Sequence, residues 1–371
     1  MIRLEVQYFN FNKHLLLAIE IKLRQNDSLQ LTSFITLKCT FDLVIKVVSS
    51  ALFFTVYLIQ YNSFCVKIKN VKNLLTQLQH VYDELKDEEE LAIIRKYGYN
   101  AKRATVVLTG ITLCLVSFFL IIQCWTKIFD VVLSINITRT RRMEFVITEY
   151  FVNQENYLFF ILLHINVAFC IGTAVILATG TLLIGCLQLI LGMFKISSYR
   201  IERAIKIYIP QDVTVKNRSL KSESLIHAVV IHREAMRLSK YLIFSFETMF
   251  ISLAGIFIIS LCFNFFRIFQ IATSKKTINE IFFPVIFAIF NIVYLFVCNL
   301  CGQNIIDYNN HVFATAYNVQ WYLAPLHIQK MILFLLLKGA KDFTVVIGGI
   351  FVSSIECFAS VIRFVLNIIL F

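Results

Sequence analysis

Long apolar stretches alternate along the chain with shorter polar and basic ones. A helix needs about 20 mostly apolar residues to cross a bilayer. Six stretches meet that need, and they are 41–62, 104–126, 157–193, 241–272, 281–302 and 343–371. The third is longer than one crossing requires, so we expect its helix to continue beyond the bilayer. The pattern predicts an all-α fold, a polytopic transmembrane helical bundle.

The polar stretches between these segments also carry a helical period. In LLTQLQHVYDELKDEEELAIIRKYGYNAKRATVVL, which starts at residue 74, the residues Leu74, Leu78, Val81 and Leu85 recur every three or four positions. That spacing is typical of an amphipathic helix. SLIHAVVIHREAMRLSKYLIF, from residue 224, runs directly into the fourth apolar stretch. We therefore expect long helices that extend past the membrane surface.

The first 40 residues lack a clear span. Glu20, Lys22, Arg24 and Asp27 interrupt 14–40, and a Lys, Arg or Asp costs about 2.5–3.5 kcal/mol at the centre of a membrane helix. YFNFNKHLLLAIEI is predicted to lie as an amphipathic helix at the membrane surface. No cleavable signal peptide is expected, because the stretch lacks a long apolar core followed by small residues.

Composition and charge support the same picture. The chain is 58% apolar and 16% charged, with a net charge of +12, whereas a soluble domain is about a quarter charged. The loops 67–103, 195–240 and 301–342 hold twenty-one Lys and Arg against six in 127–156 and 273–280. Basic loops face the cytoplasm, so the charge predicts orientation rather than nucleic-acid binding. The NIT sequon places a predicted glycosylation site, Asn136, outside.

The sequence carries no recognisable catalytic chemistry. The ten cysteines lie mostly in apolar stretches, which predicts buried thiols rather than a disulfide framework. Phosphate-binding loops, G-x-S-x-G and H-E-x-x-H are absent, and the seven histidines show no metal-ligand spacing. We expect no enzyme, no cofactor and no metal site. The lack of two similar halves disfavours a secondary transporter.

The last apolar stretch carries a polar stripe. Ser353, Glu356, Ser360, Arg363 and Asn367 are spaced by three, four, three and four residues, and Gly349 extends the row backwards. Such spacing places them on one helical face. Ionisable residues in a membrane almost always face a bundle interior or a water-filled path. Two interpretations stay open here, a pore-lining stripe repeated around an axis and a Glu356–Arg363 pair packed against a neighbouring helix.

Four stretches resemble the insect odorant receptor family. AYNVQWYLAPLHIQKMILFLLLKGAKDFTVVIGGIFVSSIECFASVI is similar to the family's C-terminal signature. GMFKISSYRIERAI resembles the end of the family's fourth span and the loop after it. LKDEEELAIIRKYGYNAKRAT resembles its first inside loop, and YFNFNKHLLLAI resembles its N-terminal intracellular segment.

The resemblance implies a seven-span receptor with an inside N-terminus, in the plasma membrane of a sensory dendrite. It implies an odorant-gated, non-selective cation channel, assembled with an obligate coreceptor as a hetero-oligomer, a tetramer, in contact with membrane lipid. One receptor domain, 1–371, would comprise an N-terminal region 1–40, a ligand-binding bundle 41–300, and an anchor and pore helix 301–371.

The resemblance also assigns residues to roles. A small hydrophobic odorant would bind in the outer half of the membrane, among the second, third, fourth and sixth spans. Candidate ligand contacts there are Phe118, Phe119, Ile122, Phe159, Phe160, His164, Phe283, Phe287 and Phe290. Tyr317, Trp321 and Tyr322 would belong to the subunit anchor. The polar stripe, closed by Phe371 at its outward end, would line the pore.

Two features depart from the family pattern. The first span is expected to be missing or degraded, because EIKLRQND follows LLLAI. The end, FVLNIILF, lacks the usual hydroxyl and tyrosine residues and is expected to stop a few residues short. Three alternatives therefore stay open. They are a gustatory-type receptor channel of the same superfamily, a G-protein-coupled receptor of opposite orientation, and a non-functional truncated odorant receptor.

Overall fold

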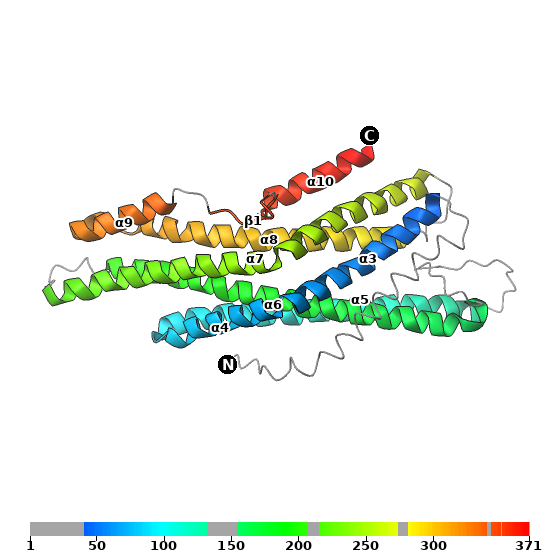
Figure 1. Cartoon of the computed structure of the whole chain (residues 1–371), viewed down its shortest axis with the longest axis horizontal. Helices are drawn as coiled ribbons and strands as arrows, with labels where there is room; N and C mark the ends of the chain where they lie inside the picture. The colour runs from blue at the N-terminus through cyan, green and yellow to red at the C-terminus, as the bar shows by residue number, and fades with distance from the viewer. Residues whose placement is uncertain are drawn as a thin grey trace.

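The protein is an elongated bundle in which long helices run side by side (Figure 1). The computed structural model describes residues 41–132, 154–206, 215–273, 281–339, 343–349 and 351–370. These residues form eight α-helices: α3 (Phe41–Val66), α4 (Ile68–Glu84), α5 (Glu88–Val132), α6 (Gln154–Lys206), α7 (Val215–Thr273), α8 (Phe282–Asn318), α9 (Leu326–Gly339) and α10 (Ile355–Leu370). A short 3₁₀ helix, η3 (Trp321–Leu323), joins α8 to α9.

Five of the six predicted spans are confirmed as helices long and apolar enough to cross a membrane. They are parts of α3, α5, α6, α7 and α8. α6 has 53 residues, so the third predicted span does continue far beyond one bilayer thickness. The predicted surface helix in 1–40 and the sequon at Asn136 lie outside the described residues.

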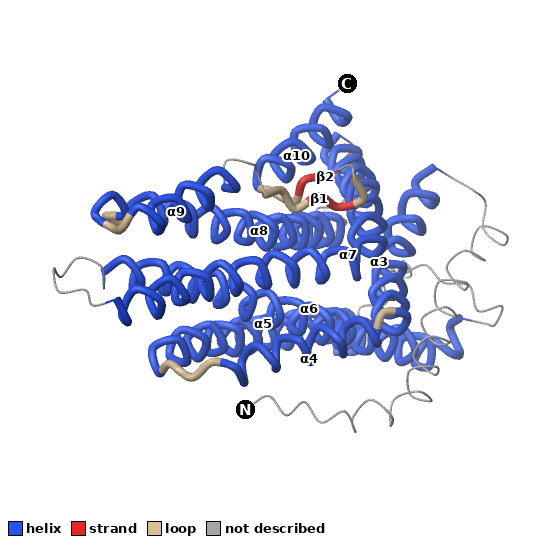
Figure 2. Tube along the Cα trace, turned by 60° about the vertical axis from the view of Figure 1, so that its left-hand side comes forward, coloured by secondary structure: helices blue, strands red, loops and turns tan. Residues whose placement is uncertain are grey.

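The sixth predicted span, 343–371, is wrong before Ile355, where its helix begins. An antiparallel hairpin of β1 (Val346–Ile347) and β2 (Phe351–Val352) precedes the helix, which begins only at Ile355. Gly348 and Gly349 have φ of 63° and 68°, a conformation that other residues adopt at a cost. Hydropathy alone does not predict this turn, because a short apolar hairpin and an apolar helix have the same hydropathy. Figure 2 shows the hairpin at the base of α10.

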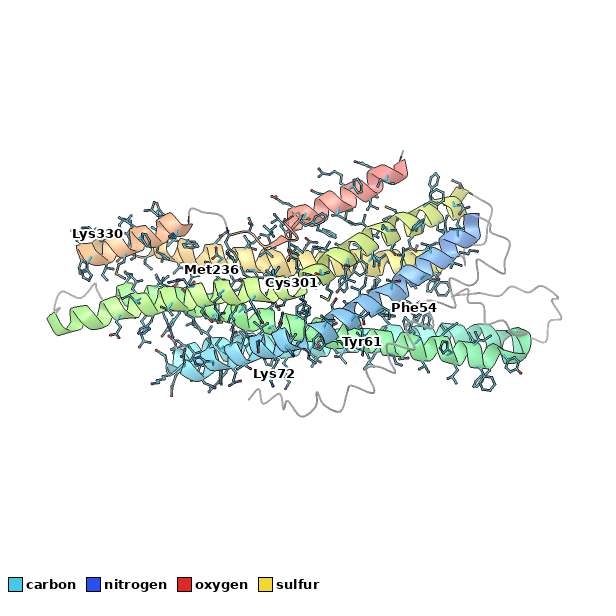
Figure 3. The ribbon with its side chains drawn as sticks, viewed as in Figure 1. Phe54, Tyr61, Lys72, Met236, Cys301 and Lys330 are labelled. Carbon is cyan, nitrogen blue, oxygen red and sulfur yellow. The ribbon has the colours of Figure 1, made fainter. Side chains whose placement is uncertain are left out.

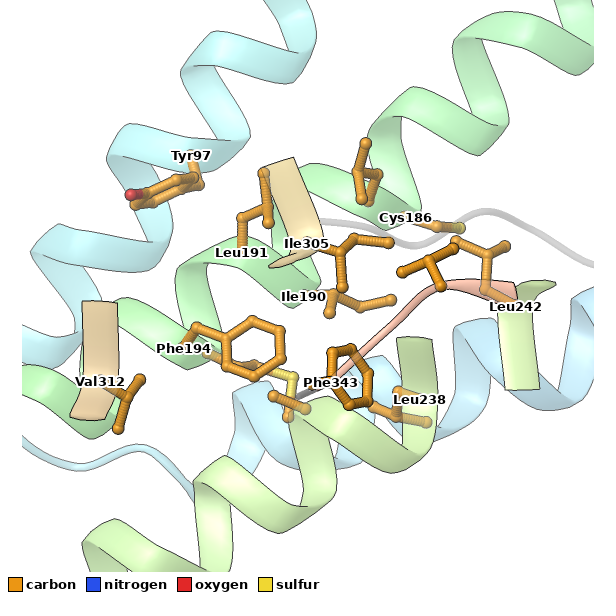
Figure 4. Packing of buried hydrophobic residues seen from close by; sticks show 14 of the residues in the cluster. Tyr97, Cys186, Ile190, Leu191, Phe194, Leu238, Leu242, Ile305, Val312 and Phe343 are labelled. Atoms are coloured by element: carbon orange, nitrogen blue, oxygen red, sulfur yellow. The ribbon is translucent and has the colours of Figure 1, made fainter. Parts of the chain in front are cut away.

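A continuous apolar core runs from the half of the bundle that holds the basic loops into the predicted spans, where Leu253, Phe257 and Ala288 belong to it. Figure 4 shows Tyr97 of α5, Phe194 of α6, Leu238 of α7 and Ile305 of α8 around it. The helical period predicted for 74–85 is confirmed, since its apolar positions are buried or half-buried against this core. α8 runs without a break through residue 300, where the sequence suggested a subdivision.

Polar contacts fix the part of the bundle that holds the basic loops. Arg200 of α6 donates to both carboxylate oxygens of Glu90 on α5, at 2.6 and 2.7 Å. Glu90 is buried, and such a bidentate pair holds two helices in one register. His232 of α7 lies 3.0 Å from the Asn309 amide oxygen of α8. These contacts position the helices that continue into the membrane.

Candidate functional site

One face of helix α3 carries both aromatic and polar side chains. Ser49, Phe53, Tyr57 and Gln60 are spaced by four, four and three residues, which places them on one side of a helix. Ser49, Tyr57 and Gln60 are fully buried among the neighbouring helices. The face therefore presents an aromatic segment between two polar ones.

The Phe53 ring is the centre of an aromatic cluster. Its centroid lies 5.1 Å from that of Tyr57, 4.9 Å from that of Phe287 and 5.6 Å from that of Phe290. Phe169 of α6 stacks on it at 6.2 Å. Edge-to-face and offset pairs at such distances are favourable. The aromatic cluster, drawn from α3, α5, α6, α7 and α8, comprises Phe53, Phe54, Tyr57, Phe119, Phe169, Phe257, Phe287, Phe290 and Tyr294; Figure 3 labels Phe54.

Tyr57 is the buried polar group within this cluster. Its side chain has no exposed surface, and its hydroxyl finds no hydrogen-bond partner among the described residues. Gly172 of α6 makes room for the ring, because a Cβ there would overlap it. An unpaired buried hydroxyl is costly and rare. It is therefore a candidate to donate to a bound molecule.

A first hydrogen-bond network borders the cluster on the outer side. Ser49 Oγ donates to Asn264 Oδ1 of α7 at 3.0 Å. Asn264 Nδ2 and Asn291 Nδ2 of α8 both donate to Ser260 Oγ, at 3.2 and 2.8 Å. All four side chains are buried. The network ties α3, α7 and α8 together through buried side chains.

A second network borders the cluster on the inner side. Gln60 Nε2 donates to the Tyr294 hydroxyl of α8, and Thr179 Oγ1 of α6 donates to Gln60 Oε1 at 3.4 Å. Gln60 and Thr179 are both buried. Together the two networks hold the helices that carry the aromatic rings.

The structure brings together three of the predicted ligand contacts. Phe119 stacks on Phe169 at 4.1 Å, and Phe287 and Phe290 contact Phe53. These three belong to the aromatic cluster.

The other predicted contacts lie elsewhere. Phe118 and Phe283 pack on the Phe282 ring, with centroids 6.1 and 5.7 Å away. Phe159 and Phe160 are 71% and 64% exposed. Two remaining predicted contacts are His164, which is half-buried in α6, and Ile122, which lies in α5 with its side chain outside the described residues. The assignment of all nine residues to a ligand site stays a prediction.

Helix α3, the first of the predicted spans, supplies the centre of the cluster, although the sequence-based candidates include none of its residues. The available signal is the row on α3, where polar residues flank aromatic ones at helical spacing. The periodic signal of such a row is weak in a helix whose other faces are apolar as well.

The base of α10 is held by α7 and α8. The Gly348 amide donates to Glu247 Oε1 of α7 at 2.6 Å. Ser353 Oγ donates to the Cys298 carbonyl oxygen of α8 at 3.3 Å, and a Cβ at Gly302 would overlap Ser353. The prediction that Ser353 belongs to the polar stripe is wrong, because it is buried before the helix begins.

The remaining stripe lies on the outward side of α10. Glu356, Ser360, Arg363 and Asn367 are exposed, whereas Val365 on the opposite side is fully buried against the bundle. Exposed apolar residues border the stripe on both sides, and they are Ile355, Phe364, Leu366 and Ile368. The stripe therefore faces away from its own bundle. Phe371 lies outside the described residues.

The predicted anchor residues lie at the far end of α8. Tyr317 and Tyr322 are exposed, and half-buried Trp321 packs edge to face with Tyr322 at 6.4 Å. Gln329 Nε2 donates to the Tyr322 and Ala324 carbonyl oxygens at 2.9 and 2.8 Å, which joins η3 to α9. Their role in subunit contact stays a prediction.

Comparisons with known proteins agree with this architecture. The chain is similar to the structure of the insect olfactory receptor OR5 from Machilis hrabei, at 14% identity and a TM-score of 0.74, over 97% of this chain and 88% of that one. It is also similar to the structure of that receptor in complex with eugenol, at 16% identity and a TM-score of 0.75, over 100% and 91% of the two chains. No curated protein sequence matches the chain.

Identities this low show a shared fold. The family relation comes from the sequence profile of the family described as 7tm Odorant receptor, which matches residues 40–366. That match spans most of the chain, including all the helices that form the aromatic cluster and most of α10. The chain belongs to the 7tm odorant receptor family, a family of multi-pass membrane receptors.

Proposed function

We propose that this protein binds volatile odorants in the aromatic cluster and contributes α10 to an odorant-gated cation channel. It would act in the plasma membrane of sensory neurons, in a hetero-oligomer with a coreceptor. Family membership supports the receptor role. The similar OR5 structure in complex with eugenol supports a small aromatic ligand.

The observation that carries the binding proposal is the buried Tyr57 hydroxyl inside the aromatic cluster. The rings supply apolar surface, worth about 25 cal/mol per Å² buried, and the hydroxyl supplies one donor. A pocket of apolar walls with one oriented polar group is typical of small-molecule sites. The preferred ligand is therefore an apolar molecule with a single acceptor, such as a carbonyl or ether oxygen.

The rings contact one another at 4.1 to 6.4 Å, so a ligand has to part them. Phe53 contacts rings of α3, α6 and α8. Its displacement would therefore move side chains on all three helices. Tyr294 links the same rings to Gln60 and lies on α8, the helix that also holds the base of α10. This gives a contiguous route from ligand to pore helix.

The orientation of α10 supports the pore proposal. The polar stripe faces away from the bundle, and the apolar residues beside it would contact α10 of neighbouring subunits. In a closed ring the stripes would then surround a central axis. The alternative Glu356–Arg363 pair against a helix of the same chain is not favoured, because both side chains are exposed.

The proposal is tested by co-expression with the coreceptor and measurement of cation current during odorant application. Cysteines at 356, 360, 363 and 367 should react with a charged thiol reagent and alter the current, whereas cysteines at 358, 362 and 365 should not. Equal reactivity on all faces would contradict the pore assignment. Full odorant-evoked current from this chain expressed alone would contradict the need for a coreceptor.

A further inference from the structure

A pocket of about 200 Å³ lies where α6, α7, α8, the hairpin and α10 meet. Its walls include Leu183 of α6, Ile251 of α7, Ile347 of the hairpin and Val361 of α10. Cys301 of α8, which Figure 3 labels, also lines the pocket. The pocket therefore joins the fixed bundle to the base of the last helix.

The pocket is separate from the aromatic cluster but shares a wall with it. Phe257 and Tyr294, whose rings lie 4.6 Å apart, line the pocket and also belong to the cluster. None of the nine predicted odorant contacts is among the described residues that line it. A molecule in the pocket would thus bind at a different place from one that parts the Phe53 ring.

Three polar side chains of the pocket, Tyr294, Asn299 and Ser353, already make hydrogen bonds. Tyr294 accepts from Gln60, and Ser353 Oγ donates to a backbone carbonyl. Asn299 Nδ2 donates to the Leu295 carbonyl oxygen at 2.9 Å. A buried water needs two to four polar partners, whereas an apolar cavity of about 150 Å³ stays dry and accepts benzene. The chemistry of the walls therefore favours an apolar occupant over water.

We propose that this pocket binds a small, neutral, monocyclic hydrocarbon or a molecule of similar size and polarity. The occupant contacts α8 and α10 at once, so it stabilises the position of α10 relative to the bundle seen here. A ligand shifts a conformational equilibrium by its differential affinity for the two states. The pocket is thus a second ligand site that modulates the pore helix, and the inference does not require the aromatic cluster to bind odorant.

Two glycines of α6 provide a matched pair of variants. A Cβ at Gly180 or at Gly185 would meet no atom within 4 Å, so both positions accept a Cβ without overlap. Gly180 lines the pocket and Gly185 does not. Gly180→Leu should therefore fill the pocket, whereas Gly185→Leu adds the same side chain to the same helix elsewhere.

The test uses the full chain in phospholipid nanodiscs, with para-xylene as the probe and methyl methanethiosulfonate as the thiol reagent. Cys298 and Cys301 line the pocket, and exposed Cys114 on α5 serves as an internal control. At ten times its Kd, para-xylene should slow modification of the pocket cysteines about tenfold, because only the unoccupied fraction reacts. Modification of Cys114 should be unchanged. The protection should disappear in Gly180→Leu and remain in Gly185→Leu.

Equal rates with and without para-xylene would overturn the proposal, as would protection that persists in Gly180→Leu. Protection by lipid alone, present in nanodiscs and absent in detergent, would assign the pocket to an acyl chain and overturn it too. If these half-buried thiols do not react in any sample, thermal unfolding decides. The midpoint should rise with para-xylene in the parent and Gly185→Leu, but a rise in Gly180→Leu or none in the parent would refute the site.

Discussion

Replacement of Gly172 by alanine tests whether the aromatic cluster is packed as described. A Cβ at Gly172 would overlap the Tyr57 ring, whereas one at Gly185 on the same helix would meet no atom within 4 Å. Overpacking of a tight core costs about 1–3 kcal/mol. The gain in helix propensity from glycine to alanine, about 1 kcal/mol, is common to both variants and cancels. Gly172→Ala should therefore be less stable than Gly185→Ala by about 1–3 kcal/mol.

The assay is the midpoint of thermal unfolding of detergent-solubilised receptor, read as the monodisperse fraction after heating. The midpoint of Gly172→Ala should lie roughly 2–6 °C below that of Gly185→Ala. The same substitution should have no such effect in a Tyr57→Ala background, because the overlapping ring is gone. The current evoked by an odorant should also fall in Gly172→Ala alone.

Two results would refute the reasoning. Equal midpoints for the two alanine variants would mean that Tyr57 does not occupy the space beside Gly172. A loss of stability that persists in the Tyr57→Ala background would place its cause outside this contact. In either case the cluster would have to be packed differently, and its proposed role in ligand binding would lose its basis.

Three further predictions concern polar groups. Tyr57→Phe should raise the unfolding midpoint, because an unpaired buried hydroxyl costs about 1–3 kcal/mol. The same variant should weaken current responses to carbonyl odorants more than responses to hydrocarbons. Equal weakening of both responses would count against the hydroxyl as a ligand donor. Glu90→Gln should destabilise the protein by about 3 kcal/mol, because it breaks a buried pair with Arg200. Glu234→Gln, in an exposed pair, should cost under about 1 kcal/mol. The unfolding midpoints of the two variants compare these costs. Glu247→Gln should keep the odorant dose–response curve, since its amide oxygen still accepts from the hairpin, while Glu247→Leu should shift it, and indistinguishable curves would show that this contact does not position α10.

The sequence by itself determined the class of the fold. Apolar stretches of bilayer length and the asymmetry of basic loops predict the spans and their orientation, because the hydrocarbon core excludes charge. It also determined which residues of α10 share a face, since Glu356, Ser360, Arg363 and Asn367 follow from helical spacing alone. The resemblance to odorant receptors was carried by local motifs, which a sequence displays directly.

Only the tertiary structure decided which apolar residues meet. With 36 phenylalanines in the chain, helices apolar on every side carry little amphipathic signal to separate lipid-facing from buried rings. Phe159 and Phe160 are exposed, whereas Phe53 lies at the centre of the cluster. No feature of the local sequence distinguishes these three residues. The hairpin before α10 likewise depends on contacts with Glu247 and α8 that lie far away in sequence. Packing between helices, rather than hydropathy, decided the site.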